Sequence, residues 1–381
     1  MIISSLQLSD YRSYERLAVE WPRGVIVLVG RNGAGKTNLL ESMVLACTGH
    51  GLGPLRDQDA VRHGAEGYAV AVAGTANGVP FNLRRNFRLP DIRTLAADGP
   101  FSPPANPAPV VTFSPEDVYI IKGAPAARRR YLDELAMTAI TGYRRAWLDY
   151  HRAVRQRNEL LRAVKKRLAR VADLEPWEMQ LAVQAARVHT GRLRVHNALA
   201  GFVAQAYERL AGAGRALQVT YRPDIVRWLG LEADIPPFAA TSPKEEHLVE
   251  AYRRVYESMR SRDVQLGVTS AGPHRDDLEI TVDRLPARTH ASQGQQRAAA
   301  LALRMAQSML VEDATHEKPV ICLDDVYSEL DDERRRLVTE FLMGYSQAFV
   351  SAASWEGLPS SGSKPLYYYV VEDGLVRPFA I

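Results

Sequence analysis

Apolar residues are grouped along this chain in two different ways, and the difference predicts where strands and helices lie. Residues 25–29 and 320–323 are unbroken apolar runs, which are typical of strands covered on both faces. Further strands are predicted at 68–73, 79–87, 110–113 and 217–221. The stretches on either side of Asn77-Gly78 are expected to form a hairpin. The proline-rich residues 90–109 predict a surface loop.

The middle of the chain has helical periodicity instead. Ser114, followed by a proline and two acidic residues, is typical of a helix start. Apolar residues then recur every seven positions at Trp147, Val154, Leu161 and Leu168. A partner row at Tyr150, Val164 and Val171 is interrupted by Arg157. After a turn at 173–176 the seven-residue spacing returns at Leu181, Val188, Val195 and Phe202. This pattern predicts an antiparallel helical hairpin or short coiled coil.

Charge is unevenly distributed along the 381 residues. The net charge is +4, but residues 122–194 carry 17 Lys and Arg against 7 Asp and Glu. A basic middle on an otherwise slightly acidic protein favours a polyanionic partner, although a solvated, Arg-rich helical face would give the same count. The only cysteines, Cys47 and Cys322, lie in apolar runs and are expected to be core thiols. With neither a signal peptide nor a membrane-spanning run, a cytoplasmic protein is expected.

A glycine-rich loop follows the first buried strand. It fits the phosphate-binding pattern G-x-x-x-x-G-K-[ST] and precedes a helical segment, and its candidate nucleotide-binding residues are Gly30, Arg31, Asn32, Gly33, Ala34, Gly35, Lys36, Thr37 and Asn38. Glycines let backbone N–H groups surround a phosphate, and the helix start adds unpaired donors. Lys36 is expected to reach the β- and γ-phosphates, and the Thr37 hydroxyl to bind Mg²⁺. A chance glycine-rich turn is the alternative, which this context disfavours.

Two acidic residues end the second buried strand. Acidic side chains at the carboxyl end of a central strand lie where ligands bind in open α/β sheets. Asp324 is the candidate Mg²⁺ ligand, and Asp325 is the candidate group that polarises the attacking water. Together with Lys36 they are the predicted catalytic residues of an ATPase. Arg12 and Arg62 could reach the nucleotide, but a structural role is about as plausible.

A third motif separates these two along the chain. The segment Ser292, Gln293, Gly294 and Gln295 precedes a helix rich in small residues, which alone would suit any capped helix. With Asp331 just beyond the second strand, it resembles the signature motif and D-loop of ABC-type ATPases. That resemblance implies that the signature contacts the γ-phosphate held by a second subunit, so that ATP bridges a homodimer.

Two further stretches make the resemblance closer. Residues 114–133 and 271–277 are similar to motifs of the RecF family of bacterial recombination mediators, and the likeness extends over essentially the whole chain. It implies ATP and Mg²⁺ as cofactors, ATP-dependent dimerisation, binding to double-stranded DNA at single-strand gaps, slow DNA-stimulated hydrolysis, and cooperation with RecR and RecO to load RecA. Asp325 departs from the glutamate usual in ABC heads, and neither a Q-loop glutamine nor a switch histidine is evident.

The spacing of the motifs helps to distinguish between subclasses of ABC-type ATPases. The long interval from Lys36 to Ser292 disfavours a transporter ATP-binding subunit and favours an SMC-like ATPase with a short insertion; another SMC-like, DNA-associated ATPase is the other alternative. The fold class predicted is α/β, an ABC-type ATPase head at 1–113 and 264–381, strand-rich at about 66–113, with a helical lobe inserted at 114–263. The candidate DNA contacts are Arg128, Arg129, Arg130, Arg152, Arg155, Arg162, Lys165 and Lys166. The first three could instead pair with acidic residues.

Overall fold

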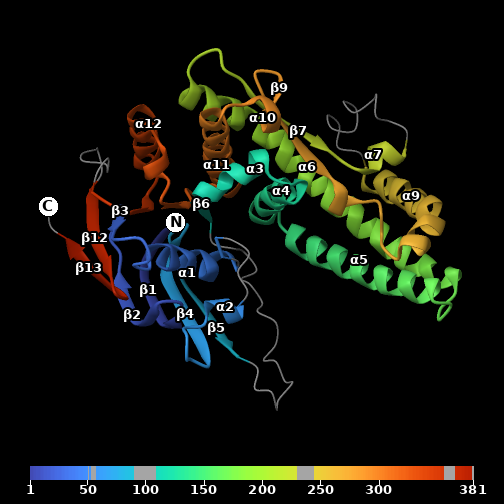
Figure 1. The fold of residues 1–381 in the computed structure, drawn as a ribbon, viewed down its shortest axis with the longest axis horizontal. Coiled ribbons are helices and arrows are strands. Elements are labelled where there is room, and N and C mark those ends of the chain that lie inside the picture. Colours follow the sequence, from blue (N-terminus) through green and yellow to red (C-terminus); the bar gives the residue numbers. More distant parts are fainter. Residues whose placement is uncertain (50, 53–56, 90–108, 230–243, 356–364, 380–381) are drawn as a thin grey trace. The chain divides into compact units, whose positions relative to one another are not determined.

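The computed structural model describes residues 1–49, 51–52, 57–89, 109–229, 244–355 and 365–379. These residues form two compact units, one made of 1–117 and 307–381 and the other of 118–306 (Figure 1). The predicted loop at 90–109 lies outside the described residues except for Pro109.

The first unit contains two sheets. A six-stranded sheet has the order β13-β12-β3-β11-β10-β6, in which β13 is the antiparallel member, and a four-stranded antiparallel sheet has the order β2-β1-β4-β5. The strands are β1 (Ile2–Tyr11), β2 (Tyr14–Glu20), β3 (Gly24–Val29), β4 (Gly67–Ala76), β5 (Val79–Arg88), β6 (Val110–Phe113), β10 (Val320–Asp324), β11 (Gln347–Ala352), β12 (Leu366–Glu372) and β13 (Leu375–Phe379). The helices are α1 (Lys36–Thr48), α2 (Asp57–Ala60) and α12 (Asp332–Met343).

The patterns of the strands match their surroundings. Every residue of β3 and β10 is buried, as their continuous apolar runs predicted, and so is every residue of β11. In contrast, β4 alternates between buried and half-buried positions over most of its length. The hairpin of β4 and β5 is confirmed, with Asn77 and Gly78 both at positive φ in its turn. One apolar core joins α1 to residues of both sheets, so the start of α1 is fixed by packing at the point where β3 ends.

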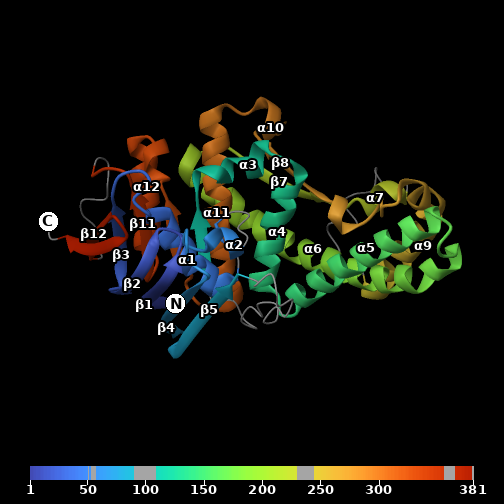
Figure 2. The ribbon, with the colours of Figure 1, turned by 60° about the horizontal axis from the view of Figure 1, so that its bottom comes forward.

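The second unit is mainly helical. Its elements are α3 (Val118–Lys122), α4 (Pro125–Ala139), α5 (Tyr143–Lys165), α6 (Glu175–Ala211), β7 (Leu217–Arg222), α7 (Ile225–Trp228), α9 (Glu245–Leu266), β8 (Asp277–Val282), β9 (Leu285–Pro286), α10 (Ala287–His290) and the first part of α11 (Gln293–Thr315), which continues into the other unit. Figures 1 and 2 show α5, α6 and α9 side by side. The strands β7, β8 and β9 form a small antiparallel sheet.

The predicted helical hairpin is confirmed as α5 and α6, but its apolar rows are shorter than expected. Val154, Leu161 and Leu181 are buried. Leu168 is 79% exposed and Val171 is 49% exposed, so placing them in the seam was wrong. The reason is that α5 ends at Lys165 and Arg167 takes a left-handed conformation, which turns the chain away from the seam.

Residues 264–306 belong to a different unit from the one that the motifs predicted. The sequence analysis grouped them with the ATPase head, whereas they belong to the mainly helical unit. Pairing of β8 with β7 along its whole length accounts for this, because β7 follows directly from the hairpin. The boundaries of the functional domains themselves stay a prediction.

Candidate functional site

The glycine-rich loop joins β3 to α1 under tight steric limits. A Cβ on Gly30 would come within 2.2 Å of the Val371 carbonyl oxygen. Gly35 has φ of +105°, and a Cβ there would lie 2.9 Å from hydroxyl oxygens of both Ser13 and Tyr14. Larger residues would therefore displace the loop at both ends, and its conformation requires these glycines.

A turn between β1 and β2 supports the loop from one side. Tyr14 donates a hydrogen bond to the Gly35 carbonyl at 3.0 Å, and Asn38 donates to the Ser13 hydroxyl at 3.0 Å. These contacts fix the start of α1. The same turn carries Arg12, whose guanidinium binds the Glu41 carboxylate at 3.2 Å and the Asp59 carbonyl at 2.9 Å. Arg62 forms an ion pair with Asp10. Both arginines thus have structural partners, which is one of the two roles considered for them.

The residues after the loop bring a cation and a hydroxyl to its centre. The buried Lys36 ammonium donates to the carbonyls of Gly30 at 2.6 Å and Arg31 at 3.0 Å. Burial lowers the pKa of Lys36, while Asp325 and Asp324 oppose that shift. Arg31, Asn32 and Gly33 are exposed, as suits groups that would meet a ligand.

The end of β10 meets this centre. The Thr37 hydroxyl donates to Asp324 Oδ1 at 3.0 Å, and the Ser351 hydroxyl donates to the same oxygen at 2.7 Å. Burial raises the pKa of Asp324, and the hydrogen bonds from Ser351 and Thr37 oppose that rise. The Asp325 amide donates to Ser351 Oγ at 2.9 Å, so one serine orients both acidic residues. The structure thus brings the two predicted halves of the site together.

The oxygens of Thr37 and Asp324 fit a small hard cation. Mg²⁺ is held in proteins by one or two carboxylates, with phosphate and water completing its shell. The described residues contain no group of three or more His, Cys, Asp or Glu that could hold a metal alone. Thr37 and Asp324 would therefore be two of the ligands, and the remainder would come from nucleotide and solvent.

Ser351 was not identified from the sequence. It is the residue before the last of the buried strand β11, and its position pairs in register with Asp324 of β10. A polar residue at the carboxyl end of a wholly buried strand was the available signal, but the sequence does not say which strand lies beside β10.

The signature residues lie at the start of α11 in the second unit. Ser292, Gln293 and Gly294 are exposed there. The Gln295 side chain accepts from the Ser292 amide at 2.8 Å, and the Gln295 amide donates to Ser292 Oγ at 3.3 Å, which is a reciprocal helix cap. In the first unit, Asp331 caps α12 by accepting from the Arg334 amide at 2.9 Å. Nothing in these local contacts tests the roles in phosphate binding, which stay predictions.

The three adjacent arginines of α4 have different surroundings. Arg128 is buried and binds the Asp277 carboxylate through two nitrogens, at 2.7 and 3.0 Å. Arg129 is half-buried and donates to a backbone carbonyl, and the exposed Arg130 pairs with Glu134. Arg128 is therefore engaged inside the unit, which agrees with the alternative that these residues pair with acidic groups.

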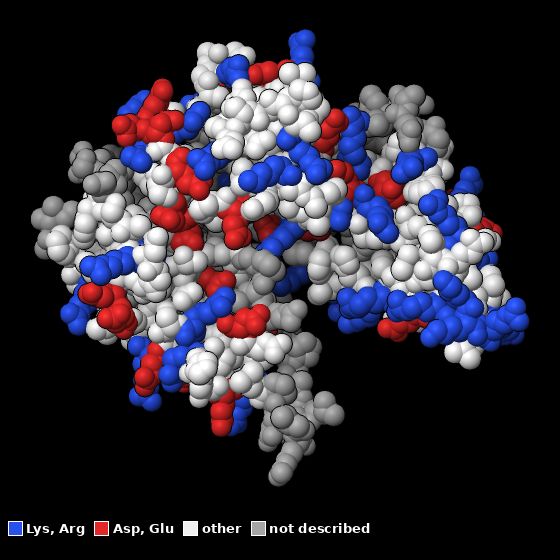
Figure 3. All heavy atoms as spheres, in the orientation of Figure 1, with Lys and Arg blue, Asp and Glu red and all other residues white. Residues whose placement is uncertain are grey.

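The candidate DNA contacts of α5, together with Lys166 directly after it, are different, because four of the five have no such partner. Arg152, Arg155, Arg162, Lys165 and Lys166 are all exposed, and Arg152 lies 3.7 Å from the carboxylate of Asp149. Within the part of the chain that the structure describes, the other four are in no ion pair. Figure 3 shows Lys and Arg side chains gathered at the lower right, where α5 lies in Figure 1, with few acidic side chains among them.

No helix formed by the described residues is long and apolar enough to cross a membrane.

Known proteins resemble this chain over nearly its full length. A family profile described as an AAA domain matches residues 5–94. A protein of Heliobacterium modesticaldum named DNA replication and repair protein RecF is 35% identical over 92% of each chain, and one of Frankia alni with the same name is 36% identical over 99% of each.

Solved structures give the same likeness. A structure of the recombination mediator protein RecF with ATPrS, in the RecFOR pathway, has a TM-score of 0.86 at 25% identity, covering 100% of this chain and 98% of that one. An Smc head bound to the C-winged helix domain of ScpA, at a TM-score of 0.51 and 15% identity over 100% of this chain and 98% of that one, shares the fold alone. The predicted α/β fold of an ABC-type ATPase head with a helical lobe is confirmed, and the chain belongs to the RecF family.

Proposed function

We propose that this protein is an ATP-dependent DNA-binding clamp of recombinational repair. The observation that carries the proposal is the 3.0 Å contact between Thr37 and Asp324, beside a loop in which Gly30 and Gly35 leave no room for a Cβ. This contact supports a joint phosphate and Mg²⁺ site, because it brings together two motifs that are 287 residues apart in the sequence. Family membership supplies the biological setting.

The site would bind ATP through the loop between β3 and α1. Backbone N–H groups at the start of α1 would hold the β-phosphate, and Lys36 would exchange its two carbonyl contacts for phosphate oxygens. A bound Mg²⁺ would neutralise phosphate charge. Asp325 would orient the attacking water, and Ser351 holds its backbone in place. The short Asp325 side chain supports slow hydrolysis, because a glutamate would reach one methylene further.

ATP would act as a switch through dimerisation. The exposed signature at Ser292 would bind the γ-phosphate held by a second copy of the chain, and Asp331 would lie in the same interface as the D-loop acid. A ligand that binds only the dimer stabilises it by mass action, and hydrolysis removes that contribution. The dimer would therefore form with ATP and separate after hydrolysis.

Duplex DNA would contact the unpaired cations of α5. Arg155, Arg162, Lys165 and Lys166 are exposed and have no ion pair in the described chain, whereas Arg128 is buried against a carboxylate. Contacts of this kind bind the phosphate backbone and are independent of sequence. The clamp would act in the cytoplasm on duplex at the edge of a single-strand gap, where RecO and RecR would join it to load RecA.

Fluorescence anisotropy of a labelled gapped duplex tests this function. At one fixed salt concentration we expect binding to strengthen with a slowly hydrolysed ATP analogue, but not with ADP or without nucleotide. Ser292→Arg should abolish the increase by blocking the signature. Gly201→Arg is the matched control, because Gly201 is exposed on α6 and has open space around it. Binding that ignores the nucleotide would contradict the clamp.

A further inference from the structure

Two segments that carry the family resemblance have no part in the proposed nucleotide chemistry. One is α4, with its three arginines, and the other is the segment 269–277, which leads into β8. Both lie in the second unit, and both contain buried charged residues, namely Arg128 and Asp133 in α4 and Asp276 in the other segment. Buried charges cost stability unless they are paired, so their partners indicate what they hold in place.

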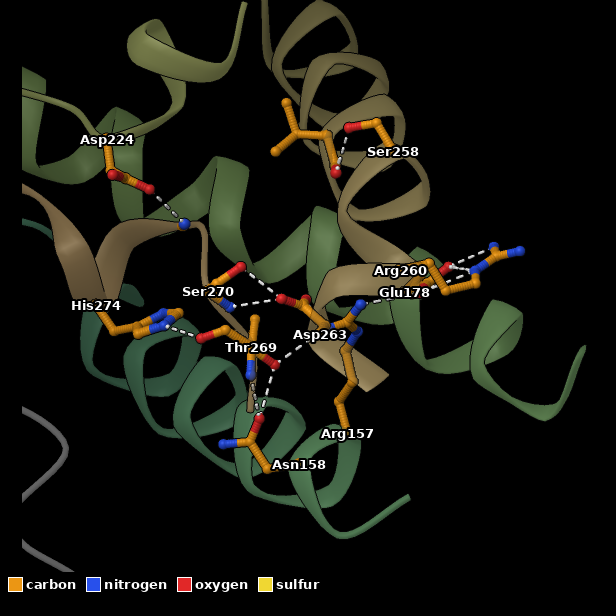
Figure 4. A network of polar contacts seen from close by, with 12 residues as sticks. Arg157, Asn158, Glu178, Asp224, Ser258, Arg260, Asp263, Thr269, Ser270 and His274 are labelled. Atoms are coloured by element: carbon orange, nitrogen blue, oxygen red, sulfur yellow. Dashed lines mark hydrogen bonds and ion pairs between the residues drawn. The ribbon is translucent and has the colours of Figure 1, made fainter. Parts of the chain in front are cut away.

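The beginning of the second segment is attached to the helical hairpin. Figure 4 shows Arg157 of α5 donating to Asp263 at 2.6 Å and to the Thr269 hydroxyl at 3.0 Å. Asp263 also accepts from the backbone amide of Ser270. The His274 ring contacts the Thr269 carbonyl at 3.0 Å, which closes the segment on itself.

The end of the segment is attached to α6. Asp276 is fully buried, and Arg192 donates to it at 2.9 Å. The same guanidinium donates to Asp133 of α4 through two nitrogens, at 2.8 and 2.9 Å. One buried arginine therefore joins α4, α6 and the segment.

α4 then binds β8 directly. Arg128 holds Asp277, the first residue of β8, through two nitrogens, and Arg129 donates to the Asp276 carbonyl at 2.9 Å. Only a planar guanidinium can bind both carboxylate oxygens in this way.

α4 also contacts α11, the helix that begins at the signature residues. The buried Tyr131 hydroxyl donates to the Leu303 carbonyl at 2.7 Å. Glu134 pairs with Arg304 at 3.3 Å. α4 thus contacts the chain on both sides of Ser292, at Asp277 before it and at Leu303 and Arg304 after it. Ser292 itself lies exposed between these attachment points.

We propose that α4 positions the signature, with Arg128 and Glu134 as the positioning residues. This inference rests on the proposed ATP-dependent dimer. Donors that bind a phosphate in a partner must be placed to a fraction of an ångström, and a rigid second layer of contacts provides that accuracy. The arginines of α4 would then serve the dimer and not DNA.

Charge reversal in the full-length protein tests the inference. The variants are Glu134→Arg, Arg304→Glu and the two together, with Arg187→Glu as a control that breaks the pair with Glu245 in the same unit. Sedimentation velocity with a slowly hydrolysed ATP analogue measures dimer affinity, and a fluorescent ATP analogue measures binding to the monomer. Each single reversal should weaken the dimer by at least about fivefold, and the double variant should recover most of that loss.

Binding of the fluorescent nucleotide should stay within about twofold of wild type in every variant, because a structural collapse would lower it and a misplaced signature would not. If a reversal does not fold, Glu134→Gln and Arg128→Lys remove the pairing with less disturbance, and both should weaken the dimer. If the wild type dimerises with the analogue and the variants dimerise equally well, the inference is overturned while the proposed function stands. The same holds if the double variant dimerises no better than the single variants. A wild-type chain that does not dimerise with the analogue would overturn the proposed function and the inference together.

Discussion

Replacing Arg157 by leucine should destabilise the second unit severely. Arg157 lies in α5, where it interrupts an apolar row, and its side chain is fully buried. Its guanidinium donates to Asp263 at 2.6 Å and to Glu178 at 3.0 Å (Figure 4). Leucine would suit the apolar row but would leave both carboxylates without this cation.

The two carboxylates would be affected unequally. Glu178 keeps an ion pair with Arg260 at 2.6 Å, whereas among the described residues Asp263 keeps only the amide and hydroxyl of Ser270. Removing one partner of a buried ion pair typically costs about 3–5 kcal/mol, because the other charge stays buried and uncompensated. Adding Asp263→Asn to Arg157→Leu removes that charge, so the double variant should regain more than half of the loss.

Hydrogen exchange of amides in α5 and α9 is the suitable measurement. The chain forms two compact units, so a single melting curve would mix two transitions, while exchange reports the stability of each region. Arg155→Leu is the control, since Arg155 is exposed on the same helix and should change stability by no more than about 0.5 kcal/mol. A loss below about 1 kcal/mol for Arg157→Leu would refute the reasoning.

Three further outcomes follow from the structure. Gly35→Ala should weaken nucleotide binding at least about tenfold in a fluorescent-ATP titration with the fold retained by circular dichroism, since its Cβ meets two hydroxyls at positive φ; unchanged affinity would contradict this. Burial lowers the pKa of His189 to about 3, so below about pH 6.5 the unfolded chain binds a proton that the folded chain does not. The stability of the second unit should therefore fall from pH 7 to pH 5 by about 2 kcal/mol more than in His189→Phe, as measured by hydrogen exchange of α6 amides corrected for their intrinsic rates; an equal fall in both proteins would contradict this. Lys165→Gln with Lys166→Gln should reduce the slope of log affinity against log salt by about 0.9 per cation; an unchanged slope would place DNA elsewhere.

The candidate nucleotide site could be proposed from the sequence because the chemistry of phosphate binding fixes neighbouring residues. A phosphate loop requires glycines, lysine and threonine at set positions between a strand and a helix, and Lys36 and Thr37 lie where that pattern places them. Ser351 and Glu41 could not be found in this way. Their contacts depend on which strand lies beside β10 and how the β1–β2 turn folds over α1, which are results of tertiary packing.

The hairpin shows the same limit. Seven-residue spacing was sufficient to predict two long helices, since an apolar seam requires it. The predicted helix extended beyond the observed end of α5, because the seven-residue spacing continues to Leu168 although the chain turns at Arg167. Arg157 looked like a fault in the seam, since its partners come from α6, α9 and the segment after α9, well separated in sequence.

The net basic charge of residues 122–194 is weaker evidence for a polyanionic partner than the count of charges suggests. A count over 122–194 leaves out acidic residues that lie later in the chain, and several of its arginines are bound to them, including Arg128 to Asp277 and Arg192 to Asp276. Successive helical residues also point about 100° apart, so three adjacent arginines in α4 could not form one surface. The exposed cations that form no ion pair within the described residues, among them Arg155, Arg162 and Lys165 of α5, are what a polyanion could bind. The case for DNA binding therefore depends on where these few charges gather and not on the net charge of the region.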